Sequence, residues 1–184
     1  VTSSEMLNYE ADDLIATYTE QILAKGAKVT IVSGDKDLMQ LVKPGVRLYD
    51  PMKSKILGNQ EVKDKFGVEP SKVVDVQALA GDSSDNVPGV PGIGIKIAAE
   101  LINKYKSLEN LLKKADEISQ KKRRETLLEN KNQAILSRKL VELKKDVPVK
   151  QNLENFILRK INKEKLYDFL REMEFNRLLS QVIS

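Results

Sequence analysis

The stretch GDSSDNVPGVPGIGIKIAAE, residues 81–100, places two aspartates, Asp82 and Asp85, directly before a Gly/Pro-rich turn that opens an apolar helix. Carboxylates attract cations, whereas a glycine-rich turn leading into a helix N-terminus attracts anions. A phosphate ligand held through a metal ion would satisfy both preferences. We therefore expect further metal ligands and a phosphate-binding surface elsewhere in the chain.

The composition narrows the chemistry that is available to this chain. It has 184 residues, of which 41% are hydrophobic, so a globular protein with a substantial core is expected. It contains no histidine and no cysteine, which excludes imidazole and thiolate metal sites and Ser-His or Cys-His nucleophiles. No apolar run of membrane-spanning length and no signal peptide are visible, so no membrane partner and a cytoplasmic location are expected.

Charge is distributed unevenly along the sequence. Residues 1–100 carry 11 Lys/Arg against 15 Asp/Glu, whereas residues 101–150 carry 14 against 7. Such a layout is expected if an acidic metal site and a phosphate-binding face lie in successive parts of one chain. A solvated, lysine-rich surface would explain the basic segment equally well.

Hydrophobic periodicity divides the chain into an α/β part and a helical part. In the first part the patterns predict a helix, a strand, a short helix and two more strands, at 10–25, 28–33, 34–42, 46–50 and 55–57. This order favours an α/β fold with a partly parallel sheet. Beyond residue 60 the patterns predict helices at 70–81, 93–105, 107–118, 120–145 and 162–175, with an extended loop at 147–156.

Seven acidic residues of the first half fall into three clusters: Glu10, Asp12 and Asp13; Asp35 and Asp37; Asp82 and Asp85. Each cluster taken alone has a structural explanation. Acids in a first helical turn interact favourably with the helix dipole, an Asp after a strand can cap the next helix, and aspartates support turns.

Taken together, the three clusters favour a metal site. Asp35 and Asp37 follow a strand directly, and ligand sites in open α/β sheets gather at the carboxyl ends of strands. An all-oxygen set selects a hard cation, Mg²⁺ or Mn²⁺, and seven carboxylates exceed the needs of one such ion. They suit a phosphodiester site with two metal ions about 3.5–4 Å apart.

Three segments, YEADD (9–13), SGDKDLMQL (33–41) and ALAGDSSDNVPGVPGIGIKIA (78–98), resemble the 5′-nuclease domain of bacterial DNA polymerase I, within the flap-endonuclease family. The resemblance extends over nearly the whole chain, with the motifs in the family's order and spacing. It implies a PIN-like α/β domain, residues 1–75, followed by a helical helix–three-turn–helix DNA-binding region, residues 76–184. The implied reaction is hydrolysis of phosphodiesters by a metal-activated water near DNA 5′ ends or flaps.

The resemblance also assigns roles to the acidic residues. Glu10 and Asp12 would serve one of two Mg²⁺ or Mn²⁺ ions, with Asp13 outside the direct ligands. The second ion would be held by three carboxylates with Asp82 nearby: Asp35, Asp37 and Asp85. The expected catalytic residues are therefore the direct ligands of both ions: Glu10, Asp12, Asp35, Asp37 and Asp85.

The turn within residues 81–100 would bind duplex DNA with a 5′ end or flap. Its backbone N–H groups and one lysine would contact phosphate, and in related hairpins the carbonyls of such a turn also hold K⁺. The residues expected to bind DNA are Gly89, Gly92, Ile93, Gly94 and Lys96. Ile95 and Ile97 stand where the family usually has polar residues, and we expect Ile97 to pack inward.

The resemblance further implies a segment before YEADD, with a first strand, two more metal-site aspartates and a basic arch, and a polymerase domain after the chain. We expect this sequence to be an N-terminally truncated fragment that is monomeric, binds DNA and cuts weakly or not at all. In the full protein it would be associated with the bacterial nucleoid and would act in DNA replication and repair.

Two other interpretations stay open at this point. One is a DNA-binding module without catalysis, in which the acids hold structure or metal only. The other is a phosphatase of the haloacid-dehalogenase type, because VTIVSGDKD (29–37) is a strand followed by D-x-D, although the Thr or Val expected soon afterwards is absent. The basic run 121–124 could contact DNA or end a solvated helix.

Overall fold

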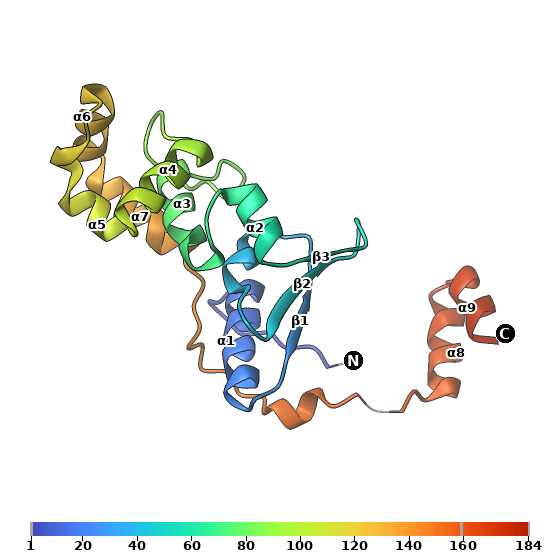
Figure 1. Cartoon of the computed structure of the whole chain (residues 1–184). Coiled ribbons are helices and arrows are strands. Elements are labelled where there is room, and N and C mark those ends of the chain that lie inside the picture. The colour runs from blue at the N-terminus through green and yellow to red at the C-terminus, as the bar shows by residue number, and fades with distance from the viewer. Residues whose placement is uncertain (1, 159, 184) are drawn as a thin grey trace. The chain divides into compact units, whose positions relative to one another are not determined.

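The sheet has three strands, in the order β1 (Val29–Val32), β2 (Val46–Asp50) and β3 (Lys55–Leu57) (Figure 1). This is a computed structural model, and it describes residues 2–158 and 160–183. β1 pairs parallel to β2, with Val29 opposite Val46, and β2 pairs antiparallel to β3. The expected α/β fold with a partly parallel sheet is confirmed.

Helix α1 (Ala11–Ala24) packs against β1 and against the 3₁₀ helix η1 (Asp37–Leu41), which connects β1 to β2. Figure 1 shows α1 alongside β1. Helix α2 (Asn59–Phe66) follows β3 and was not expected from the pattern, because its mean character is polar and only Val62 and Phe66 are buried. Its ends are nevertheless well defined: the N–H of Gly58 donates to Glu61 Oε2 at 2.9 Å, and Gly67 ends the helix at φ 70°.

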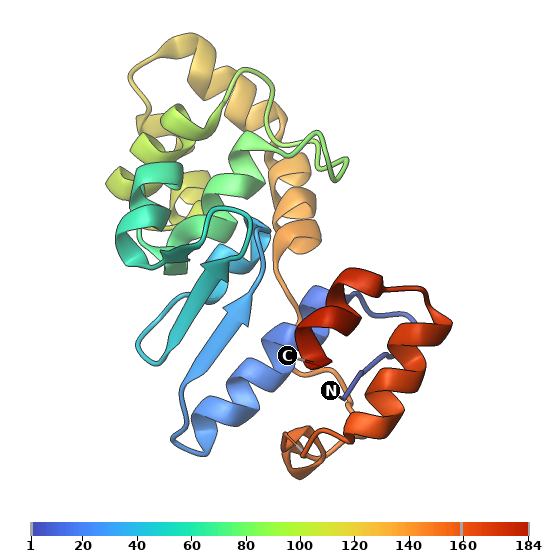
Figure 2. The same cartoon turned by 90° about the vertical axis from the view of Figure 1, so that its right-hand side faces the viewer.

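Between residues 70 and 141 the secondary structure is helical. The helices are η2 (Pro70–Lys72), α3 (Val73–Ala80), α4 (Ile95–Tyr105), α5 (Leu108–Lys113), η3 (Ala115–Glu117), α6 (Lys121–Glu129) and α7 (Lys131–Val141). α3 lies at the centre and packs against both α4 and α7. In both views α6 lies at the end of the unit farthest from the sheet (Figures 1 and 2).

The prediction of a single helix at 120–145 is wrong, because the structure has two helices that meet at Asn130. Asn130 has φ −107° and ψ 21°, and its side-chain amide donates to the carbonyl of Thr126 at 2.8 Å. An Asn side chain that bonds to nearby backbone competes with the helical ladder, so it suits a helix end. The helix also stops at Val141, short of the expected residue 145.

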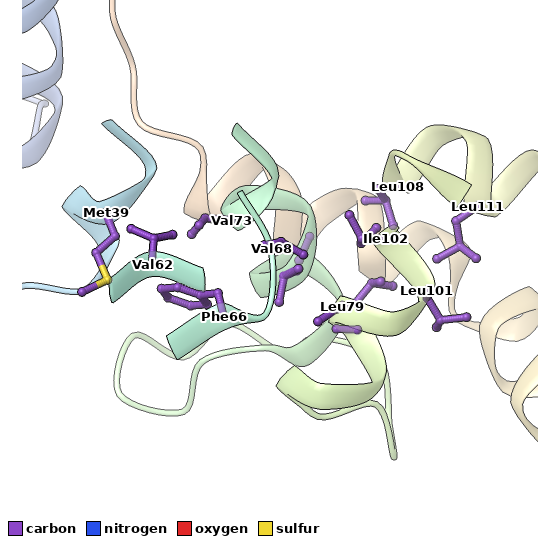
Figure 3. Packing of buried hydrophobic residues seen from close by; sticks show 14 of the residues in the cluster. Met39, Val62, Phe66, Val68, Val73, Leu79, Leu101, Ile102, Leu108 and Leu111 are labelled. Atoms are coloured by element: carbon purple, nitrogen blue, oxygen red, sulfur yellow. The ribbon is translucent and has the colours of Figure 1, made fainter. Parts of the chain in front are cut away.

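One hydrophobic core runs from the sheet to the helices, and its members all lie between Ala16 and Ala134. Figure 3 shows Met39, Val62 and Phe66 at one end of it, followed by Leu79 and then by residues of α4 and α5. Phe66 is 1% exposed and Leu79 is fully buried. α3 contacts both η1 and α7, and the loop that carries Asp82 and Asp85 follows it directly.

Residues 150–184 form a separate compact unit together with the first four residues, whereas residues 5–149 form the other. The smaller unit contains η4 (Leu153–Phe156), α8 (Lys163–Glu172) and α9 (Asn176–Ile183). α8 and α9 pack against each other, and the hydroxyl of Tyr167 donates to the carbonyl of Val182 at 2.9 Å. Over 147–156 the structure has η4 and no strand. No helix in the described parts of the chain has the length and apolarity that crossing a membrane requires.

Candidate functional site

The loop after α3 brings Asp82 and Asp85 to a defined position. Gly81 and Gly89 stand at its two ends with φ of 72° and 60°, and a Cβ on Gly89 would lie 2.4 Å from the backbone N of Gly81. The backbones of Asp82 and Val87 exchange two hydrogen bonds of 2.9 and 2.8 Å, which close the loop. Only glycine permits two backbone segments to approach so closely at positive φ, so the two ends of the loop are held together in a narrow, fixed neck.

Asp35 and Asp37 follow β1 directly, at the carboxyl end of the strand. The N–H of Asp35 donates to Ser33 Oγ at 3.0 Å, and Asp35 Oδ1 in turn accepts from the N–H of Asp37 at 2.9 Å. This local turn directs the chain into η1. The Asp35 side chain therefore has a turn-forming role besides any role toward a ligand.

Asp37, Asp82 and Asp85 each offer a carboxylate oxygen within 4.8 Å of the others. Among the described residues this is the one group of three carboxylates at such spacing. The ammonium of Lys36 lies 2.6 Å from Asp82 Oδ2 and 3.7 Å from Asp85 Oδ2, and it also donates to Ser84 Oγ at 3.1 Å. A lysine thus supplies positive charge to a concentration of negative charge.

The pKa values of this group reflect its surroundings. Burial would raise the pKa of Asp82, but hydrogen bonds from Lys36 and Ser84 outweigh burial and lower it. The same hydrogen bond to Asp82 raises the pKa of Lys36. For Asp37, burial raises the pKa, and the hydrogen bond from Gln77 and the charge of Lys36 oppose that rise. Lys36 and Ser84 thus favour the anionic form of Asp82, whereas burial disfavours the anionic form of Asp37.

The first cluster lies within electrostatic reach of the second. Burial, followed by the charges of neighbouring carboxylates that include Asp35 and Asp37, raises the pKa of Asp12 to about 6. Glu10 is exposed at the start of α1 and makes no side-chain cap. Asp13 Oδ1 instead accepts from the N–H of Lys144 at 2.8 Å.

Gln77 of α3 is a site residue that the sequence did not reveal. Its side-chain amide donates to Asp37 Oδ1 at 2.6 Å, and the residue is 3% exposed. Its own Oε1 is buried and accepts no hydrogen bond. A glutamine on an apolar helix carries no spacing signal, and its partner lies 40 residues away in sequence, so only the three-dimensional structure shows this contact.

The residues expected to bind DNA divide into two groups. The N–H of Gly89 donates to Ser137 Oγ at 3.0 Å and the N–H of Ile93 to the carbonyl of Val90 at 3.1 Å, so both donors are engaged within the protein. Gly92, Gly94 and Lys96 are exposed. Ile97 packs against the core as expected, whereas Ile95 is 43% exposed.

Gly94 is the N-cap of α4, and no side chain caps the helix there. The first intrahelical bond is that of the Ala98 N–H to the carbonyl of Gly94. The N–H groups of the first turn are therefore directed outward at a helix start, where an anion is stabilised. In the basic run 121–124, Arg124 donates to the carbonyl of Ile118 at 3.0 Å and so also fastens the start of α6.

Comparison with known proteins gives the class and then the family. The flap endonuclease of bacteriophage T5, solved as a pseudo-enzyme–product complex with DNA and metal ions, has a similar fold, with a TM-score of 0.68 at 20% identity over 74% of this chain and 50% of that one. The fold is that of the flap-endonuclease-like nucleases. Residues 1–67 match a family model described as the N-terminal resolvase-like domain of 5′-3′ exonucleases, and residues 68–164 one described as their C-terminal SAM fold. The chain belongs to the 5′-3′ exonuclease family.

Curated relatives agree with this assignment. DNA polymerase I of Rhizobium leguminosarum is 54% identical over 178 residues, covering 97% of this chain and 18% of the relative. The 5′-3′ exonuclease of Aquifex aeolicus (strain VF5) is 42% identical over 178 residues, covering 97% of this chain and 60% of the relative. The chain thus spans a minor part of the first protein and three fifths of the second.

These matches set aside one interpretation and leave the expected N-terminal truncation without support of its own. The haloacid-dehalogenase alternative is set aside, because the chain belongs to a nuclease family.

Proposed function

We propose that this chain is a divalent-metal-dependent 5′-3′ exonuclease and flap endonuclease module that hydrolyses phosphodiesters near DNA 5′ ends. The observation that carries the proposal is the convergence of Asp37, Asp82 and Asp85 within 4.8 Å beside a family-typical α/β fold. We further propose that it acts on bacterial DNA in replication and repair, in the cytoplasm, as the relative named DNA polymerase I suggests.

The residues fit Mg²⁺ or Mn²⁺. All donors are carboxylate oxygens, and the Lys36 ammonium beside two of them supports a preference of this group for a cation. When bound, a divalent ion lowers the pKa of water and stabilises charge on a phosphate. Asp37 would be held in place for this by Gln77, and Asp82 by the N–H and hydroxyl of Ser84 at 3.1 and 2.6 Å.

The other ion would take Glu10 and Asp12, while Asp35 would serve the same ion as Asp37 and Asp85. Support comes from the field of Asp35 and Asp37 at Asp12, which is strong enough to help raise the pKa of Asp12 to about 6. A cation there would relieve the repulsion between these carboxylates.

The start of α4 would bind a phosphate of duplex DNA without sequence preference. The uncapped first turn, exposed Gly92 and Gly94, and the charge of Lys96 support this role. Carbonyls of the same turn would hold K⁺. Gly89 contributes by shaping the loop neck rather than by donating to phosphate, because its N–H already donates to Ser137.

A cleavage assay tests the proposal directly. With a 5′-labelled flap substrate and Mg²⁺, Asp37→Asn should lower the cleavage rate by about 100-fold or more, since a metal ion contributes several kcal/mol of charge stabilisation in such reactions. Asp64→Asn is the matched control, because Asp64 is an exposed acid of α2 that accepts a hydrogen bond from Gln60 of its own helix and lies outside the group of Asp37, Asp82 and Asp85. Equal rates for wild type and Asp37→Asn would refute the proposal.

A second candidate function is DNA binding with little cleavage by residues 1–184 alone. It is favoured because the described residues bring together one carboxylate group of three, whereas two-metal hydrolysis requires two ions fixed in place. Fluorescence anisotropy on the same substrate separates the two functions. Salt-sensitive binding with slow cleavage at saturating Mg²⁺ would favour the second.

A further inference from the structure

The three acidic clusters come from three different parts of the fold. Glu10 to Asp13 begin α1, Asp35 and Asp37 lead into η1, and Asp82 and Asp85 lie on the loop after α3. Metal ligands must be held within a fraction of an ångström, and partners outside the first coordination shell usually do this. One stretch of chain, residues 133–147, makes hydrogen bonds at or beside all three clusters, and we call it the bracing segment.

Its first contacts are with the neck of the aspartate loop. Ser137 is fully buried, and its Oγ accepts the N–H of Gly89 at 3.0 Å. The side-chain amide of Gln133, one helical turn earlier in α7, donates to the carbonyl of Gly89 at 2.6 Å. Both polar groups of Gly89 are thus fixed by α7, and Gly89 packs backbone to backbone on Gly81 at the start of the loop.

Its second contact is with η1, through Gln40. This residue follows Asp37 by three positions and is 9% exposed. Its amide nitrogen donates to the carbonyl of Val141 at 2.9 Å, and its Oε1 accepts from the N–H of Leu143 at 3.2 Å. Both polar atoms of the Gln40 side-chain amide are therefore hydrogen-bonded to the backbone where α7 ends.

Its third contact is with α1. The N–H of Lys144 donates to Asp13 Oδ1 at 2.8 Å, and the N–H of Val147 donates to Thr17 Oγ1 at 3.1 Å. The Thr17 hydroxyl itself donates to the carbonyl of Lys144 at 3.3 Å, and Thr17 is 1% exposed. The helix that carries the first acidic cluster is thereby fastened to the same segment.

We propose that the bracing segment sets the relative positions of the three acidic clusters, and that Gln40 and Ser137 are positioning residues for a divalent ion held by Asp37, Asp82 and Asp85. Gln40 fixes the element that carries Asp37, and Ser137 fixes the loop that carries the other two aspartates. The proposal rests on the metal site proposed above. It also assigns a function to glutamine and serine side chains that neither touch a ligand nor pack as part of the apolar core.

The test measures Mn²⁺ affinity of the whole chain by calorimetry at a temperature well below the melting transition. Gln40→Met keeps the length of the side chain and removes both hydrogen bonds, and Ser137→Ala removes the acceptor of the Gly89 N–H. Each should weaken Mn²⁺ binding by about tenfold, the lower end of what partners beyond the direct ligands contribute. Asp37→Asn should weaken it more.

Matched controls lose a similar hydrogen bond away from the acidic clusters. Gln60→Met removes the bond of Gln60 to Asp64 on α2, and Ser107→Ala removes the bond from the Asn110 N–H at the start of α5. Their melting temperatures show how much stability such a loss costs, while their Mn²⁺ affinity should equal that of wild type.

The outcomes are distinguishable. If wild type binds Mn²⁺ and both Gln40→Met and Ser137→Ala bind it equally well, the bracing inference is overturned while the proposed metal site stands. If wild type does not bind Mn²⁺, the metal site itself is refuted and the inference with it. Should Gln40→Met fail to fold, Ser137→Ala alone decides, because it removes only one oxygen atom.

Discussion

At the scale of single residues, burial and neighbouring carboxylates disfavour the ionised form of Asp12. Its pKa is raised to about 6 from 3.8, first by burial and then by four neighbouring carboxylates. A carboxyl group whose pKa is raised by folding destabilises the folded state when it is ionised. Its favourable contribution is complete below pH 3.8 and is lost as the pH rises through 6.

Asp12→Asn should therefore stabilise the metal-free protein at pH 7.5. The shift corresponds to almost 3 kcal/mol at full strength, and because Asp12 is half-exposed we expect about 1 kcal/mol after solvent screening. Urea unfolding in EDTA measures the difference. The difference in unfolding free energy between Asp12→Asn and wild type should shrink by more than half at pH 4.5, where the wild-type carboxyl is largely protonated in the folded state. A difference that is the same at both pH values would contradict this account, and Asp64→Asn should show no such dependence.

At the scale of elements, the loop between α3 and α4 depends on a contact between two glycines. Gly89 has φ 60°, and a Cβ there would lie 2.4 Å from the N and 2.6 Å from the Cα of Gly81. Neither atom belongs to a side chain that could rotate away. The backbone itself would have to shift, and the two hydrogen bonds between Asp82 and Val87 would be strained with it.

Gly89→Ala should accordingly destabilise the protein by about 3 kcal/mol or more, which combines left-handed strain with overpacking. Gly26→Ala provides the control, because Gly26 also has positive φ, 75°, but nothing lies within 4 Å of the added Cβ. It should cost about 1 kcal/mol from backbone strain alone. Urea unfolding of both variants compares the two costs, and equal losses would show that the contact with Gly81 contributes nothing.

The sequence predicted the elements whose signal is local. The run 28–33 became β1, and apolar spacing placed α1, α4 and α8 within a few residues of their bounds. It failed where the signal is weak: α2 has only two buried side chains, α9 was missed, and Asn130 breaks a pattern that continues across it.

The acidic clusters could be predicted from the sequence because aspartates at strand and helix ends are a local feature. Their supports could not, since Gln77, Gln40 and Ser137 find partners 40 to 103 positions away. Such contacts depend on how α3 and α7 pack, which hydrophobic periodicity does not specify. Gly89 illustrates the same limit, because its conformational role could be inferred but not its bond to Ser137.

At the scale of the whole molecule, the chain consists of two compact units with unequal cores. The hydrophobic cluster lies between Ala16 and Ala134, so none of its members comes from residues 150–184. In the smaller unit Leu170 is the one buried hydrophobic residue among those described. A unit with its own core can fold independently, whereas one with few buried apolar groups opens easily.

Removing residues 150–184 should therefore change the main melting transition by no more than about 3 °C, which for a domain of this size corresponds to roughly 1 kcal/mol. Differential scanning calorimetry compares the two chains. Hydrogen exchange in the full chain should be fast in α8 and α9 and slow in α3. A large fall in the melting temperature on deletion would show that the small unit stabilises the larger one.

The closed neck of the aspartate loop has a kinetic consequence. Residues 82–88 give up their conformational freedom when the protein folds, because two backbone hydrogen bonds join the ends of the loop. An arriving divalent ion therefore meets carboxylates that already converge, and no segment has to be ordered at that moment. What must leave is the ammonium of Lys36 and the water around the ion. Association should thus be as fast as dehydration of the ion permits, with Mn²⁺ exchanging faster than the more reluctantly dehydrated Mg²⁺.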